Sequence, residues 1–147
     1  MHKTGCKILT INAVVLIVLG IYSVLFNNTP LFSVINWIMD PNFWGNEMLS
    51  NGTLKFKIFT WDILGMFHVI WGINILFIVK YGLMPKKESW AWKCILVQVV
   101  VWLVVIAYFT VSVKKNTYFP VTLLFAVLFI VPLMMTRDVL RIKGAGN

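Results

Sequence analysis

The stretch FTWDILGMFHVIWGIN, residues 59–74, places an aspartate and a histidine inside a run that is otherwise apolar enough to cross a lipid bilayer. A helix needs about 20 predominantly apolar residues to cross the hydrocarbon core, and this run extends from residue 57 to residue 80. Ionisable side chains are costly at that depth, so they usually face other protein groups or a functional site. The stretch predicts a membrane helix and raises the question of what Asp62 and His68 contact.

Composition and hydropathy extend this prediction to the whole chain. The 147 residues are 60% hydrophobic and 12% charged, with a mean hydropathy of +0.86, far from the balance of a soluble domain. Three more runs are long enough to span, at residues 7–26, 92–113 and 118–136. We expect a single all-α membrane domain over residues 1–147, a polytopic antiparallel bundle of four transmembrane helices. The apolar segment LFSVINWIM, residues 31–39, predicts a short interfacial helix in the first outer loop, residues 27–56.

The basic residues predict the orientation of this bundle. Of the 13 lysines and arginines, nine lie at the N-terminus, in the loop between the second and third runs, or in the C-terminal tail. Because cytoplasmic loops carry the excess of positive charge, both termini should be cytoplasmic, in a protein of the plasma membrane. The net charge of +8 is gathered beside apolar runs rather than along one face, which favours the lipid bilayer and not nucleic acid as the partner.

Four residues form a candidate ligand-binding site. On a helical wheel, Asp62 and His68 share a stripe with two glycines, and glycines let a neighbouring helix come close, so we expect this stripe to face the bundle interior. Trp102 and Tyr108 of the third run reach the depths of His68 and Asp62, respectively. The four side chains would line a site that opens outward. In the alternative interpretation, Asp62 caps its helix or pairs with a nearby lysine, and His68 joins two helices.

A second set of residues predicts contacts between helices. The glycines of the stripe are Gly65 and Gly72, and the amides Asn12, Asn74 and Gln98 each lie five or six residues inside a flanking lysine. Amides at one depth can form hydrogen bonds across helices. Asn74 lies well off the glycine stripe, so it meets either a second interior neighbour or a partner subunit.

Other motifs are few. Asn27 and Asn51 each begin an Asn-x-Thr sequence in the first outer loop and are candidate glycosylation sites. The two cysteines form no CxxC motif and no Cys/His set with zinc spacing, so we expect no metal and no cofactor. A nucleophile paired with a base is also missing from the sequence pattern, and we therefore assign no catalytic residue.

The segment DILGMFHVIWGINILFIVKYGLMPKKESWAWKC, residues 62–94, combines an apolar helix with glycines, a basic loop, and SWAWK at the start of the next helix. It resembles small uncharacterised four-helix integral membrane proteins, a resemblance that implies a fold and no activity. We expect a non-catalytic multi-pass protein, an accessory or interaction subunit that contacts other membrane protein subunits. The alternative is a binder or carrier of a lipophilic small molecule in an outward-facing cavity around Asp62 and His68. An enzyme that acts on a lipid is the least favoured interpretation.

Overall fold

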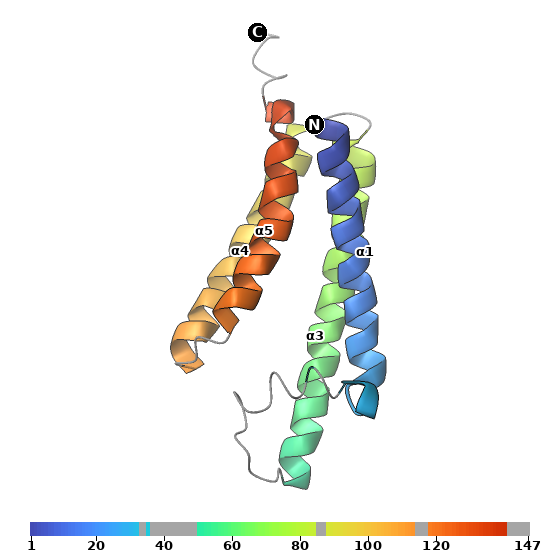
Figure 1. Ribbon diagram of the computed structural model, residues 1–147, viewed down its shortest axis with the longest axis vertical. Coiled ribbons are helices and arrows are strands. Elements are labelled where there is room, and N and C mark those ends of the chain that lie inside the picture. The colour runs from blue at the N-terminus through green and yellow to red at the C-terminus, as the bar shows by residue number, and fades with distance from the viewer. Residues whose placement is uncertain (33–34, 36–49, 85–87, 114–117, 141–147) are drawn as a thin grey trace. The chain divides into compact units, whose positions relative to one another are not determined.

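The residues that the structure describes are almost all helical and none of them forms a strand, which confirms the all-α prediction. This computed structural model describes residues 1–32, 35, 50–84, 88–113 and 118–140, with the backbone alone at 109, 110, 112, 113 and 118–122. The long helices are α1 (His2–Phe26), α3 (Asn51–Ile78), α4 (Ser89–Val113) and α5 (Tyr118–Met135) (Figure 1). Shorter elements are the 3-10 helices η1 (Pro30–Phe32) and η3 (Arg137–Leu140), and a π-helical turn η2 (Val79–Leu83) that continues α3.

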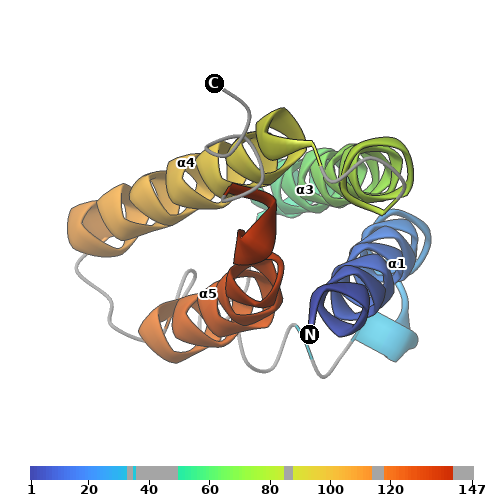
Figure 2. The ribbon, with the colours of Figure 1, turned by 90° about the horizontal axis from the view of Figure 1, so that it is seen from above.

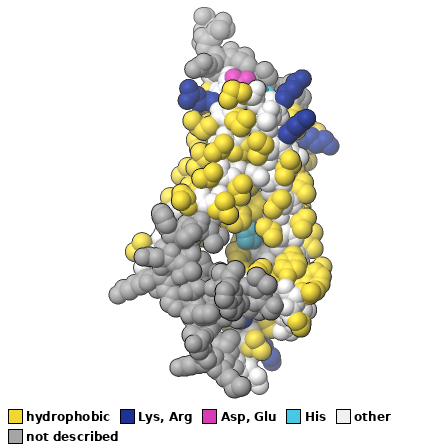
Figure 3. Space-filling view, in the orientation of Figure 1, with side chains coloured by type: hydrophobic (Ala, Val, Ile, Leu, Met, Phe, Trp, Pro, Cys, Tyr) yellow, Lys and Arg dark blue, Asp and Glu magenta, His cyan; other side chains and the backbone are white. Residues whose placement is uncertain are grey.

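Three helical stretches are long and apolar enough to cross a membrane: His2–Phe26, Asn51–Leu83 and Ser89–Tyr108. The apolar part of α5 with described side chains, Leu123–Met135, is shorter. Hydrophobic side chains cover much of the described surface on the face seen in Figure 3. Helices hide their backbone polar groups by internal hydrogen bonds, as hydrocarbon requires, and their apolar side chains can face lipid. These features indicate a membrane protein.

The predicted interfacial helix, residues 31–39, falls mostly outside the described residues, and its first part is the 3-10 turn η1. The helices otherwise extend past the predicted spans: α1 begins at His2 instead of residue 7, and α3 begins at Asn51 instead of residue 57.

The chain divides into two compact units, and each is described by itself. Unit 1 comprises Met1–Val14 and Ile73–Asn147, and unit 2 comprises Val15–Gly72.

Unit 2 is built on a close approach between α1 and α3. A Cβ atom placed on Gly20 would lie 2.5 Å from the carbonyl oxygen of Gly65, and one placed on Gly65 would lie 2.7 Å from that of Gly20. Such contact between backbones requires glycine on both helices. The two helices run in opposite directions here, because Asn27, which lies beyond Gly20 just after the end of α1, meets Asp62, which precedes Gly65 on α3.

In unit 1, α4 and α5 lie side by side (Figures 1 and 2). The indole Nε1 of Trp92 donates to the carbonyl oxygen of Leu133 across a distance of 2.8 Å, and the rings of Trp102 and Phe125 lie 5.6 Å apart. The first turns of α1 pack against α5, since a Cβ atom on Gly5 would lie 2.7 Å from the carbonyl oxygen of Pro132. The fully buried side chains of this unit include Leu9, Ile75, Leu83, Ile95, Val99, Phe129 and Leu133.

Candidate functional site

Asp62, the acid in the opening stretch, has a hydrogen-bond partner in unit 2. The side-chain nitrogen Nδ2 of Asn27 donates to Oδ1 of Asp62 across 2.7 Å. Asn27 directly follows the last residue of α1 and is buried, whereas Asp62 is half-buried on α3. A carboxylate in an apolar helix is stabilised by a donor of this kind. The contact gives Asp62 a structural role that joins the end of α1 to α3.

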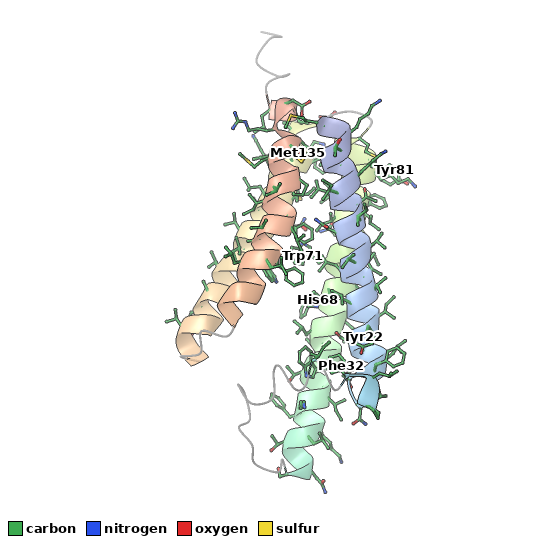
Figure 4. All side chains as sticks on the ribbon, in the orientation of Figure 1. Tyr22, Phe32, His68, Trp71, Tyr81 and Met135 are labelled. Carbon is green, nitrogen blue, oxygen red and sulfur yellow. The ribbon has the colours of Figure 1, made fainter. Side chains whose placement is uncertain are left out.

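Aromatic rings close the same end of unit 2. Phe32 is completely buried, with its ring stacked 5.7 Å from that of Tyr22 and edge-on at 5.1 Å from that of Trp61 (Figure 4). The Tyr22 hydroxyl donates to the carbonyl oxygen of Leu31, and Oγ1 of Thr29 donates to that of Phe26 at 2.7 Å. These bonds fold the chain back after α1 so that the Phe32 ring is inserted beside α3.

His68 makes its hydrogen bond within its own helix. Its Nδ1 lies 2.8 Å from the carbonyl oxygen of Leu64, and because a carbonyl only accepts, Nδ1 carries the hydrogen. A groove of about 450 Å³ lies on unit 2. Neither His68 nor Asp62 lines this groove, whose residues are all apolar: Ile21, Val24, Leu25, Met66, Val69 and Ile70.

Trp102 and Tyr108 lie on α4 in unit 1, whereas Asp62 and His68 lie on α3 in unit 2. Trp102 contacts Phe125 of α5, and Tyr108 is 72% exposed. The four-residue ligand-binding site therefore stays a prediction. What the structure does bring together is Asp62 with Asn27, a residue that the sequence pattern had offered only for glycosylation.

The three predicted amides have different surroundings. Asn12 donates through Nδ2 to the carbonyl oxygen of Leu128 on α5, and Gln98 lies 3.5 Å from the sulfur of Cys94 on its own helix. Asn74 is exposed on α3. Gly65 faces Gly20, and Gly72 is buried. The acceptor for Asn12 is thus a backbone carbonyl, which no amide motif in the sequence would indicate.

The two candidate glycosylation sites also differ. Asn51 is exposed at the first residue of α3. Asn27 is only 7% exposed, and its Nδ2, the atom that would carry a glycan, is the donor to Asp62. A glycan on Asn27 would require the hydrogen bond to Asp62 to break. A glycan on the exposed Asn51 would not disturb that bond. Modification of either residue stays a prediction.

A polar cluster that sequence reasoning missed lies in unit 1, around His2. The ring nitrogen Nδ1 lies 2.9 Å from Oδ1 of Asp138, and Nε2 lies 3.1 Å from the carbonyl oxygen of Leu83 and 3.6 Å from Sγ of Cys6. His2 and Cys6 are four residues apart on one helix, a spacing that places them on one face. Asp138 is 136 positions from His2, so no local pattern could have indicated the pair.

Among the described residues, no three His, Cys, Asp or Glu side chains lie close enough together to hold a metal ion. The polar chemistry of the described chain is concentrated in the Asn27–Asp62 pair and the His2 cluster. Comparison with protein-family models, with curated proteins and with solved structures gives no match to this chain.

Proposed function

We propose that this chain is a non-catalytic, multi-pass membrane protein that serves as an accessory or interaction subunit of a membrane complex. The observation that supports this function is the environment of Asn74. Its side chain is exposed on an apolar helix and, within the described part of the chain, makes no hydrogen bond. Since an amide in hydrocarbon lacks water as a partner, a polar group on another helix would stabilise it.

The side chains around Asn74 support a protein partner. Ile73, Phe77 and Tyr81 are each more than half exposed and, with Asn74, form what we call the Asn74 face. The rings of Phe77 and Tyr81 lie 4.5 Å apart, and the Nζ atom of Lys80 lies 5.4 Å from the centre of the Tyr81 ring. Aromatic side chains are enriched at protein interfaces because they bury much apolar area at a low cost in side-chain entropy.

Site-specific photo-crosslinking in native membranes tests this function. A photoreactive residue at Asn74 should give a discrete adduct with a different protein, which mass spectrometry then identifies. The matched control is Val100 on α4, which is 47% exposed and has only apolar residues next to it and three or four positions away along the helix, and it should give no discrete adduct. A lack of adducts at Asn74, or adducts with a second copy of this chain alone, would contradict a role as subunit of a larger complex.

We further infer four antiparallel spans with both termini in the cytoplasm of a plasma-membrane protein. The support is the charge distribution: nine basic residues lie in the segments that we place in the cytoplasm, and four lie in the segments that we place outside. A membrane-impermeant maleimide applied to intact cells should label Lys115→Cys, whereas Lys3→Cys should require permeabilisation. The unsubstituted chain is the control for Cys6 and Cys94, of which Cys6 is buried. Labelling of both positions in intact cells would contradict this topology.

A further inference from the structure

The apolar groove of unit 2 lies beside the contact between α1 and α3. Each helix lines it with three residues at the spacing i, i+3 and i+4, which places them on one side of the helix. Cγ2 of Val24 lies 2.8 Å from the position of a Cβ atom on Gly65, and Val24 is half-buried. Cγ2 of Val69, also half-buried, lies equally close to the Cβ position of Gly20. The two valines therefore form the floor of the groove, and its rims are the exposed side chains of Ile21, Leu25, Met66 and Ile70.

Asp62 lies one helical turn beyond the end of this groove. It precedes Met66 by four residues, so it lies on the same side of α3, about 6 Å away along the helix axis. His68 lies about 200° from Met66 around the helix and faces away from the groove. Asn27 donates to Oδ1 of Asp62, and no other described residue donates to this carboxyl group. Since a carboxylate can accept about four hydrogen bonds, Asp62 has acceptor capacity left for a ligand.

We propose that the groove and Asp62 together form a binding site for a lipophilic amine, with the apolar body of the ligand in the groove and its ammonium group beside the carboxylate. A protonated amine supplies the positive charge and the N–H donors that a carboxylate in an apolar helix needs. The volume of the groove, about 450 Å³, is that of a small-molecule site. The site belongs to unit 2 and the Asn74 face to unit 1, so either proposal can fail without the other.

The rims of the groove favour a small molecule over a partner helix. Helix interfaces in membranes are enriched in small residues, because these let two backbones approach closely. The small residues at this place, Gly20 and Gly65, are already used in the contact between α1 and α3. The rims consist of larger side chains, and Met66 among them is flexible enough to adapt to the shape of a ligand. A body much narrower than a helix therefore fits between them.

The charges near the groove favour an amine over a phospholipid. A phosphate group needs a cation, and the exposed basic residue on this side of α3 is Lys55. Lys55 precedes Met66 by eleven residues, or three turns, and so lies about 16 Å from it along the axis. Asp62 is about 10 Å closer to the groove than Lys55 and would repel a phosphate held there. The charge at the end of the groove is thus complementary to a cation.

Photo-crosslinking with a synthetic amphiphile tests the site. The probe is a primary alkylamine that carries a diazirine in its chain, added to the full chain in phosphatidylcholine nanodiscs, and the control is the carboxylic acid with the same chain and diazirine. Mass spectrometry should map the amine adducts to the groove residues of α1 and α3. The amine should label these residues about tenfold more than the acid does, because only the amine pairs with Asp62. Equal labelling by the two probes, or amine adducts mainly on α4, would overturn the proposal.

Two substitutions on the same side of α3 assign the charge that attracts the probe. Asp62→Asn should reduce labelling by the amine about tenfold, to the level of the acid, while thermal unfolding shows that the variant is folded. Lys55→Gln is the matched control and should leave amine labelling unchanged. Unchanged labelling in Asp62→Asn would refute the contact with the ammonium group. If Asp62→Asn did not fold, the comparison of amine with acid on the unsubstituted chain would still decide.

A phosphatidylglycerol probe with the diazirine in one acyl chain examines the other lipophilic occupant. It should give no discrete adduct in the groove of the unsubstituted chain. Labelling of the groove by this probe that is lost in Lys55→Gln would assign the groove to a phospholipid and would overturn the proposal.

Discussion

The side-chain amide of Asn12 on α1 donates a hydrogen bond to the carbonyl oxygen of Leu128 on α5. In an α-helix that oxygen would accept from the backbone N–H four residues later, but residue 132 is a proline and has no N–H. Asn12 thus supplies from a neighbouring helix the donor that α5 lacks. This contact explains both a polar residue on α1 and the tolerance of a proline inside α5.

Replacing Asn12 by leucine should therefore lower the free energy of unfolding by about 1 kcal/mol, because the Leu128 carbonyl loses its donor. In a Pro132→Ala background, the N–H of residue 132 can make the helical bond, and the same Asn12→Leu change should cost less than about half as much. Reversible unfolding in mixed micelles measures all four members of this cycle. Equal losses in both backgrounds would show that Asn12 does not replace the proline's missing donor.

The contact between Gly20 and Gly65 predicts a strong effect from a single methyl group. In Gly20→Ala the added Cβ would lie 2.5 Å from a backbone oxygen that cannot rotate away, so α1 and α3 must separate. We expect a loss of about 1–3 kcal/mol in unfolding free energy. Gly52→Ala is the control, since the nearest atom to its added Cβ, Oγ of Ser50, is 4.0 Å away. A Gly20→Ala protein as stable as Gly52→Ala would contradict the close approach.

The sequence could predict the helices but not their side-chain partners. Hydropathy located α1, α3 and α4 to within six residues at each end because the hydrogen bonds of a helix are local. Lys80 was expected to end the second span, yet the helix continues to Leu83, since a lysine marks a membrane boundary rather than a helix end. The partners of Asn12 and His2 lie 116 and 136 positions away. They depend on which helices pack together, and one sequence carries no direct signal of that.

Phe32 should contribute more to the stability of unit 2 than its position in a connecting turn suggests. Its ring is completely buried between Tyr22 and Trp61, and truncation of a buried phenylalanine typically costs about 3–5 kcal/mol. Phe32→Ala should therefore lower the thermal unfolding midpoint markedly. The neighbouring Leu31 is 64% exposed and offers its backbone carbonyl to Tyr22, so Leu31→Ala should have little effect. Similar midpoints for both variants would contradict this role of the ring.

Because of the Asn27–Asp62 hydrogen bond, Asp62→Asn and Asn27→Leu should differ in their effect on the free energy of unfolding. In Asp62→Asn, the side-chain oxygen of the new residue can still accept from Asn27, so the free energy of unfolding should change by less than about 1 kcal/mol. In Asn27→Leu, the Asp62 carboxylate loses this donor, and the loss should be about 1.5–3 kcal/mol because the acceptor is charged. Asn28→Leu, at the exposed neighbouring position, is the control for Asn27→Leu.

The same pair of variants separates a structural role of Asp62 from a ligand-binding role. If Asp62 binds a cationic or proton-donating group of a lipophilic molecule, Asp62→Asn removes the charge needed for that contact and should abolish binding in a protein that remains stable. If Asp62 only joins α3 to the end of α1 through Asn27, stability should follow the hydrogen bond: retained in Asp62→Asn, lost in Asn27→Leu. Unfolding curves and binding of lipophilic probes, measured on the same preparations, distinguish these outcomes. Only a ligand-binding role predicts that Asp62→Asn loses probe binding while the protein keeps its stability.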